Sequence, residues 1–265
     1  MQSTIAIIGF GEAGSTFARS AGWGQQACAF DILPTRERLM AELGIRAAAS
    51  PAAALAGASL VLSLVTADQA LRAAQECAAA IPDGLLWCDM NSVAPETKRA
   101  AARTIEEAGA RFVDVAVLAP VEPAGLAVSL LLSGPAAPDA ETALRNAGFL
   151  NVRVVGNAVG QASAIKMIRS VMVKGIEALT DEMIAAARAA GVESEVLASL
   201  DASDKPQPWA TRAAYNIERM ATHGKRRAAE MEESVATLQS FGVEPIMTRG
   251  TVLRQRRAAS GNPAT

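Results

Sequence analysis

A glycine-rich turn close to the start of the chain places the strongest constraint on its fold. The apolar run at residues 4–8 leads into the sequence GFGEAG at residues 9–14, and a helix-forming segment follows. Gly9 permits a tight turn, Gly11 lets a ligand approach the backbone, and Gly14 lets the new helix pack closely on the strand. The start of such a helix offers free N–H groups and a positive dipole end to an anion. We therefore expect residues 9–14 to hold the pyrophosphate of a dinucleotide.

An acidic residue at the end of the next apolar run bears on the choice of cofactor. Asp31 follows residues 27–30, near the roughly 20-residue offset at which a carboxylate meets the adenosine ribose. Such a carboxylate accepts hydrogen bonds from both ribose hydroxyls and repels a 2′-phosphate, so Asp31 favours NAD over NADP. Arg36 and Arg38 leave NADP open, because an arginine here could bind the extra phosphate. Both arginines also fit a solvated helix face.

The spacing of apolar residues changes after about residue 157. Before this point, short apolar runs typical of strands alternate with helical patterns, which predicts a parallel, doubly wound sheet. Further strands are expected at residues 59–65, 85–90, 111–117, 128–132 and 151–155, and helices through residues 71–77, from residue 95 and within residues 139–147. Beyond Gly160 a long apolar-periodic helix runs to about residue 190 and is interrupted at Gly191.

These patterns predict an α/β Rossmann domain followed by an all-α C-terminal domain, with a long interdomain helix joining the two. Residues 1–157 are the expected NAD(P)-binding domain, and residues 158–257 are an all-helical domain for substrate binding and dimerisation. A turn is expected at residues 205–208, and residues 258–265 are expected to form a disordered tail.

Composition excludes several classes of protein. The chain has 265 residues, of which 51% are hydrophobic, so it can bury a substantial core. No apolar stretch reaches the roughly 18 residues of a membrane span, and no basic region precedes the first apolar run, so we expect neither a membrane partner nor a signal peptide. Cys28, Cys77 and Cys88 lack metal-ligand spacing and are expected to be buried free thiols. A cytoplasmic enzyme without a metal site fits these features.

Charge is distributed unevenly along the chain. Residues 205–257 hold ten Lys and Arg against five Asp and Glu, although the whole chain has a net charge of −2. The basic residues are interleaved with acidic ones and lack aromatic partners, so nucleic acid is not an expected ligand. An anionic small substrate, or contact with an acidic surface in a homodimer, fits the asymmetry better.

Several segments, taken in order, resemble the β-hydroxyacid dehydrogenases, the family of 3-hydroxyisobutyrate and 6-phosphogluconate dehydrogenases. Within this family, the chain resembles the branch whose C-terminal domain has no settled function. The matching segments are residues 9–18, Val65-Thr66, residues 89–95 (DMNSVAP), Asp114 and residues 156–166. The resemblance implies that Val65, Thr66 and Asn91 join the cofactor site and that Ser92 meets the substrate. It also implies that Lys166 is the catalytic lysine.

Lys166 needs a special environment to act as a base. Lysine has an ordinary pKa of about 10.4, so desolvation or nearby positive charge must lower it for proton transfer near neutrality. Apolar residues at 164–168 bracket Lys166, and Lys174 lies two turns further along the helix. Ser170 stands where the family usually has an asparagine one turn after the lysine, and it can still donate a hydrogen bond. Without the resemblance, a lone lysine in an apolar helix is more often a snorkelling side chain.

One family motif is altered. Where many members have Ser-Gly-Gly to bind a substrate carboxylate through backbone N–H groups, this chain has Leu118-Ala119-Pro120, and Pro120 has no N–H to donate. A polar stripe in the C-terminal region offers a replacement, at Arg212, Tyr215, Asn216, Arg219, His223 and Arg226. Their spacing of three or four residues places them on one helix face. The same pattern fits a solvated face or a dimer seam.

Together these features predict an NAD(P)-dependent dehydrogenase that transfers a hydride between nicotinamide and a small, anionic hydroxy or carbonyl compound. The expected catalytic residues are Lys166 as general acid and base, and Ser170. The expected cofactor-binding residues are Gly9, Phe10, Gly11, Glu12, Ala13, Gly14, Asp31, Val65, Thr66 and Asn91; the expected substrate-binding residues are Ser92, Lys174, Arg219 and His223. An imine reductase and a non-catalytic NAD sensor remain alternatives. Imine-reducing relatives typically lack the lysine, so Lys166 argues against the first.

Overall fold

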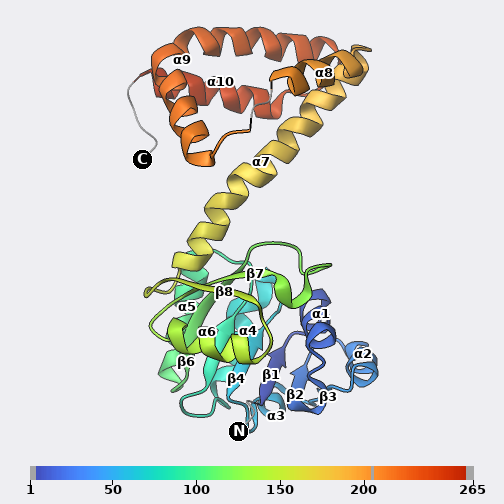
Figure 1. Cartoon of the computed structure of the whole chain (residues 1–265), viewed down its shortest axis with the longest axis vertical. Coiled ribbons are helices and arrows are strands. Elements are labelled where there is room, and N and C mark those ends of the chain that lie inside the picture. Colours follow the sequence, from blue (N-terminus) through green and yellow to red (C-terminus); the bar gives the residue numbers. More distant parts are fainter. Residues whose placement is uncertain (1–3, 204–205, 261–265) are drawn as a thin grey trace. The chain divides into compact units, whose positions relative to one another are not determined.

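The computed structural model describes residues 4–203 and 206–260 (Figure 1). The chain divides into two compact units, residues 1–169 and residues 170–265, each described here by itself. The strands are β1 (Ile5–Ile8), β2 (Ala27–Phe30), β3 (Arg46–Ala47), β4 (Leu60–Ser63), β5 (Leu86–Asp89), β6 (Arg111–Val117), β7 (Ser129–Ser133) and β8 (Asn151–Gly156). The first unit also contains helices α1 (Glu12–Ala21), α2 (Arg36–Glu42), α3 (Pro51–Leu55), α4 (Ala70–Ala78), α5 (Pro95–Glu107) and α6 (Ala137–Asn146).

The eight strands form one sheet in the order β3-β2-β1-β4-β5-β6-β7-β8. Neighbouring strands are parallel except for β6 and β7, which are antiparallel, so the prediction of a parallel sheet is wrong at this pair. The connection between them explains the difference, because a parallel return needs a crossover of about a dozen or more residues, usually with a helix. Residues 118–128 contain only the short 3-10 turn Gly125–Ala127, whereas α6 provides the crossover from β7 to the parallel β8.

Hydrophobic layers cover both faces of the sheet, because successive strand residues point to opposite sides. In β1, Ile7 belongs to the layer that contains Phe17 of α1 and Leu144 of α6. Ile8 belongs to the other layer, with Ile105 of α5 and residues of α3 and α4. Helices on both faces are the arrangement expected of a Rossmann domain, and the predicted α/β fold class is confirmed.

The strands and helices expected in the first unit are present, although several strands are shorter than expected, and β3 and α3 are additional short elements. The three cysteines are buried free thiols, as predicted. Burial, together with the nearby charge of Glu76, raises the pKa of Cys77 to about 12. Burial and the charge of Asp89 also raise the pKa of Cys88 to about 12, against a smaller opposite effect of Lys98.

Four helices follow the sheet: α7 (Gln161–Ala189), α8 (Glu193–Ser203), α9 (Trp209–Ser240) and α10 (Ile246–Ala259). α7 begins in the first unit and continues into the second, and the predicted domain boundary after residue 157 falls just before it. The predicted interruption at Gly191 is confirmed, because this residue follows α7 with a φ of 70°. α10 includes residues 258 and 259 of the expected tail, whereas residues 261–265 of that tail and residue 205 of the expected turn lie outside the described residues.

Within the second unit, α9 and α10 pack very closely. A Cβ on Gly224 would lie 2.4 Å from the carbonyl oxygen of Gln255, and Ala228 and Val252 are buried nearby along the same two helices. The carboxylate of Glu182 in α7 accepts hydrogen bonds from the N–H groups of residues 247 and 248 at the start of α10. Among the residues that the structure describes, no helix combines the length and apolar character that a membrane span requires.

Candidate active site

The turn between β1 and α1 has the backbone shape that its glycines allow. Gly9 has a φ of 93°, and a Cβ on it would lie 2.5 Å from the carbonyl oxygen of Leu64. A Cβ on Gly14 would lie 2.6 Å from the carbonyl oxygen of Gly9, so α1 packs too closely on this turn for a side chain. A Cβ on Gly11 would meet nothing within 4 Å, so open space lies beside the loop. α1 begins at Glu12 without a side-chain cap, which leaves N–H groups of its first turn available to an anion. The loop therefore fits a pyrophosphate.

Asp31, directly after β2, is hydrogen-bonded to this loop. Its carboxylate accepts a hydrogen bond from the backbone N–H of Phe10 at 2.6 Å and another from the N–H of Leu33 at 2.8 Å. These contacts orient the carboxylate, and each oxygen keeps a lone pair for a further donor such as a ribose hydroxyl. The side chain of Phe10 is fully buried, so Phe10 contributes to the loop through its backbone.

A pocket of about 380 Å³ opens next to Asp31. Its mostly apolar lining comes from the segments after β1, β2 and β4 and from α4, and Arg36 and Arg72 also lie on its wall. Nε of Arg36 is buried and has no hydrogen-bond partner within the described part of the chain. Arg38, in contrast, forms an ion pair with Glu42 at 2.9 Å and lies outside the lining. Arg36 is thus the arginine placed where the alternative cofactor would need one.

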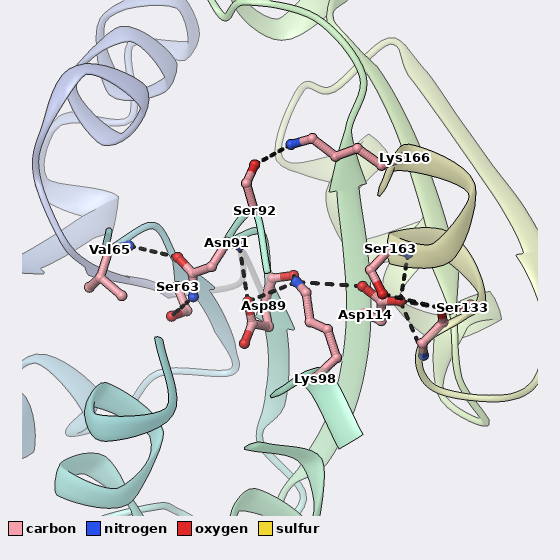
Figure 2. Close-up of polar contacts among 11 residues, drawn as sticks. Ser63, Val65, Asp89, Asn91, Ser92, Lys98, Asp114, Ser133, Ser163 and Lys166 are labelled. Atoms are coloured by element: carbon pink, nitrogen blue, oxygen red, sulfur yellow. Dashed lines mark hydrogen bonds and ion pairs between the residues drawn. The ribbon is translucent and has the colours of Figure 1, made fainter. Parts of the chain in front are cut away.

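A second pocket, of about 420 Å³, brings together some of the residues predicted for the cofactor, substrate and catalytic sites. Its lining includes Glu12 and Ala13 of α1, Val65 and Thr66 after β4, Asn91 and Ser92 after β5, and Lys166 of α7. The ammonium group of Lys166 donates a hydrogen bond to the hydroxyl of Ser92 (Figure 2). The loop after β5 and the start of α7, which are far apart in the sequence, therefore meet at this pair.

The surroundings of Lys166 differ from the expectation. Its apolar helix neighbours Ile165 and Ile168 are 41% and 72% exposed, so they do not enclose the half-buried lysine. The reason is helical geometry, because adjacent residues of a helix point in different directions. Apolar contacts in the pocket come instead from other elements, among them Val117 and Val121.

Asn91 fixes the loop beneath this pair. Its Oδ1 accepts a hydrogen bond from the N–H of Val65 at 2.8 Å, and its Nδ2 donates to the hydroxyl of Ser63 at 3.0 Å. Its own N–H donates to Oδ1 of Asp89 at 2.9 Å. Asn91 is only 4% exposed, and both ends of its amide are bonded within the protein. Its side chain therefore joins the ends of β4 and β5.

Sequence reasoning missed Lys98, a fully buried lysine below Asn91. Nζ of Lys98 lies 2.9 Å from Oδ1 of Asp89 and 3.4 Å from Oδ1 of Asp114. A signal was present, because Lys98 shares the buried face of α5 with Ala101, Ala102 and Ile105 at helical spacing. A lysine on such a face needs a buried acid as its partner.

The altered segment after β6 lies beside Lys166. Ala119, Pro120 and Val121 line the second pocket, so the residue without an N–H is part of its wall. Arg169, one turn after Lys166, was also missed from the sequence. Its Nη1 donates to the carbonyl oxygen of Leu118 at 3.3 Å, which places an exposed guanidinium next to this wall.

The other predicted site residues belong to the second unit, and none of them lines the two pockets described above. Ser170 is half-buried and Lys174 is exposed. Arg219 donates to the hydroxyl of Tyr215 at 2.8 Å and lies 5.3 Å from the centre of its ring. His223 is exposed in a shallow basic depression on α9. In the described part of the chain, no group of three or more His, Cys, Asp or Glu side chains could hold a metal ion.

Comparison with known proteins extends this description. Residues 187–258 match a domain of unknown function (DUF1932). A conserved hypothetical protein of Sinorhizobium meliloti 1021 is 35% identical, with a TM-score of 0.66 over 100% of this chain and 91% of that one. A conserved protein described as structurally similar to 3-hydroxyacid dehydrogenases is 28% identical, with a TM-score of 0.64 over 98% of this chain and 99% of that one. An imine reductase of Streptomyces aurantiacus shares the fold, at 22% identity and a TM-score of 0.77 over 98% of this chain and 96% of that one.

The sheet and the glycine loop carry the family assignment. Residues 4–148, more than half of the chain, match the family described as the NAD binding domain of 6-phosphogluconate dehydrogenase. The description of this family names a dehydrogenase, and the Streptomyces aurantiacus neighbour is a reductase. The predicted resemblance and the predicted nicotinamide cofactor are thus confirmed: the chain belongs to the family that carries the NAD binding domain of 6-phosphogluconate dehydrogenase.

Proposed function

We propose that the protein transfers a hydride between its nicotinamide cofactor and a small, anionic hydroxy or carbonyl compound. The contact between Lys166 and Ser92 carries the proposal, because it places a proton donor and acceptor in the pocket that Glu12 and Thr66 also line. The bound cofactor supplies the hydride donor or acceptor. The substrate must then exchange one proton with the protein for each hydride that it gains or loses.

Lys166 is the proposed general acid and base. In alcohol oxidation, neutral Nζ takes the hydroxyl proton as the hydride leaves the carbon, and in reduction the ammonium returns that proton to the carbonyl oxygen. Ser92 would orient Nζ through the hydrogen bond described above. We also assign Ser170 to the catalytic residues, as a hydrogen-bond donor one turn further along the helix.

The glycine loop and Asp31 are the proposed cofactor site. N–H groups at residues 12–14 would bind the pyrophosphate, and the oriented carboxylate of Asp31 would accept hydrogen bonds from the ribose hydroxyls. This arrangement favours NAD. Arg36, with its buried and unpaired Nε, is the residue through which NADP would be accommodated.

An anionic substrate is proposed from the charges near the altered segment. Since Pro120 offers no N–H, a substrate carboxylate or phosphate must be bound by side chains. The guanidinium of Arg169 lies beside this wall of the pocket, in contact with Leu118. Lys174, Arg219 and His223 are the further substrate-binding residues that we propose.

A homodimer is also part of the proposal. The described residues of the second unit bury only three hydrophobic side chains, Ala187, Ala228 and Val252, while residues such as Met172 and Ile176 are 48% and 47% exposed. So small a core does not stabilise a helical unit, whereas obligate homodimer interfaces are rich in such apolar surface. A second copy of the chain is the proposed partner of this surface.

Imine reduction is the second candidate function. Its support is the shared fold of the Streptomyces aurantiacus imine reductase, and a C=N substrate also needs one proton from the protein. Lys166 favours the oxygen compounds, because a lysine can exchange a proton with a hydroxyl in both directions. A non-catalytic NAD sensor is the third reading, supported only by the altered segment at Pro120.

The test is the substitution Lys166→Met. Cofactor binding should remain nearly intact, because the glycine loop and Asp31 are unchanged, while turnover falls by about 10²–10⁴, the usual effect of a lost general acid or base. Turnover is measured by absorbance of the reduced nicotinamide on a panel of hydroxy acids, aldehydes, ketones and imines, and binding by nicotinamide fluorescence. Arg103→Met removes a positive charge from an exposed side chain of α5 that lines neither pocket, so it is the matched control and should alter neither quantity.

The outcomes separate the three readings. Unchanged turnover in Lys166→Met would remove the lysine from the mechanism, and turnover of imines alone would favour the reductase. No turnover by the unmodified protein across the panel, with intact NADH binding, would favour the sensor.

A further inference from the structure

The strongest unexplained feature of the first unit is a group of three buried charges. Lys98 of α5 is 0% exposed, Asp89 at the end of β5 is 1% exposed, and Asp114 of β6 is 0% exposed. The two aspartates are register partners on neighbouring parallel strands, so their carboxylates lie side by side. Nζ of Lys98 approaches Oδ1 of both and also donates to the carbonyl oxygen of Asp89 at 2.5 Å. One cation therefore holds two like charges together.

The first carboxylate controls the loop that carries Ser92. Oδ1 of Asp89 accepts the N–H of Asn91, and the side chain of Asn91 in turn binds Val65 and Ser63. Ser92 follows directly in the sequence. The position of its hydroxyl thus depends on Asp89 through one intervening residue.

The second carboxylate controls the helix that carries Lys166. Oδ2 of Asp114 accepts the N–H groups of Gly160 at 3.1 Å and Ser163 at 2.9 Å, at the start of α7. It also accepts the hydroxyl of Ser133 at 3.2 Å, and the oxygen of that hydroxyl accepts the N–H of residue 162 at 2.9 Å. Asp114 therefore caps α7 one turn before Lys166.

Figure 2 shows two series of contacts that both start at Lys98. One passes through Asp89 to the loop that carries Ser92, and the other passes through Asp114 to the start of the helix that carries Lys166. The hydrogen bond between Lys166 and Ser92 joins their far ends. We propose that Lys98, Asp89 and Asp114 are positioning residues that set the distance between Lys166 and Ser92. This inference rests on the proposed function of Lys166. A buried ion pair adds little net stability compared with apolar residues, so a role in fixing geometry accounts better for three buried charges at this place.

Two substitutions that change the net charge of this buried group in opposite directions test the proposal. Lys98→Met makes the buried group more negative, and Asp114→Asn makes it less negative. If the group acts by position, both lower kcat by about 10–100-fold, the effect expected of a misplacement near 1 Å, while the dissociation constant of NADH changes by less than about threefold. If it acted only through its electric field, the two variants would change kcat in opposite directions, and that result would overturn the proposal.

A matched control separates positioning from loss of stability. Ile105→Ala removes a fully buried side chain from the same face of α5 and leaves the three charges intact. It should lower the melting temperature but leave kcat unchanged. A loss of kcat equal to that of Lys98→Met would show that any damage to this helix has the same effect, and the proposal would fail. Should Lys98→Met not fold, Asp114→Asn decides by the same comparison.

A second measurement needs no substrate. The chain has five lysines, so ¹³C labelling at the lysine ε carbon gives few signals, and Lys166→Arg assigns the one that matters. In Lys98→Met and Asp114→Asn this signal should move toward its position in Ser92→Ala, where the contact is absent, and it should stay in place in Ile105→Ala. An unmoved signal would refute the positioning role. If the unmodified protein turns over no substrate, the proposed function fails while this measurement still decides the inference.

Discussion

The two units of the chain differ in how many of their apolar side chains they bury. The first unit buries apolar residues on both faces of its sheet and pairs the charges that it buries, as at Lys98. Of the 19 large hydrophobic side chains that are exposed in the described residues, 14 belong to the second unit. The first unit thus has a large core of its own, whereas the described residues of the second unit form only a small one. This difference fits the proposal that the first unit alone forms the cofactor site and that a second copy of the chain covers the apolar helices of the second unit.

The largest expected effect concerns that surface. The double substitution Met172→Asp and Ile176→Asp places charges on one apolar face of α7, and we expect the dissociation constant of the dimer to rise by about 10³-fold or more, since each buried aliphatic side chain contributes about 1.5–3 kcal/mol. Sedimentation velocity over a range of concentrations measures this change. Leu150→Asp makes the same kind of change at a side chain of the first unit that is 65% exposed, and it should leave assembly unaltered. If the unmodified protein were a monomer, the proposal that a second copy covers this apolar face would be wrong.

An intermediate effect is expected at the cofactor pocket, which lies entirely in the first unit. Asp31→Ala removes the carboxylate that would bind the ribose, so NADH should bind about tenfold more weakly and discrimination against NADPH should relax, as for lost hydrogen bonds to a charged group. Fluorescence titration with both cofactors measures the two constants. Asp31→Asn keeps the size of the side chain and separates the loss of charge from disturbance of the loop at Phe10. Tight NADPH binding by the unmodified protein without measurable NADH binding would contradict the assignment.

The smallest expected effect lies within the second unit, at Glu182. Burial alone would raise the pKa of Glu182, but hydrogen bonds from the Thr248 hydroxyl and from N–H groups at residues 246–248 outweigh it and lower the pKa. A carboxylate whose pKa falls on folding stabilises the protein above its unfolded pKa of about 4.3, and this contribution disappears as the pH falls through the folded value. Glu182→Gln should therefore melt a few degrees lower than the unmodified protein at pH 7, and the difference should shrink in acid.

Glu193, a half-buried glutamate of the second unit, provides the control for this pH dependence. It pairs with Arg188 at 2.9 Å at the surface, where an ion pair adds little stability. Glu193→Gln should therefore melt close to the unmodified protein at both pH values. An equal loss in both variants would show that the buried cap at the start of α10 has no special role.

Local signals explain what could be predicted from the sequence. The glycine turn at residues 9–14 and the strands of the sheet depend on short apolar runs and on glycines, which act within a few residues. The prediction that all strands are parallel is wrong at β7, because the direction of this strand depends on the length of the connection before it. The acidic partners of Lys98 belong to β5 and β6, and no local pattern predicts which strand residues will meet a given helix. The roles of all the predicted site residues stay predictions, and those of Ser170, Lys174, Arg219 and His223 also depend on parts of the structure outside the first unit.

The antiparallel return of β7 also determines where this chain can accept inserted residues. Residues 118–128 leave β6 and come back as β7, and on the way they form one wall of the Lys166 pocket. The N–H of Leu118 donates to the carbonyl oxygen of Ser129 at 3.0 Å, which joins the two ends of this segment, and the hydroxyl of Thr16 donates to Glu122 within it at 3.1 Å. Residues inserted between these contacts would reshape the wall without shifting the strands or the glycine turn. A duplicated gene could therefore acquire a new substrate here with few compensating changes elsewhere.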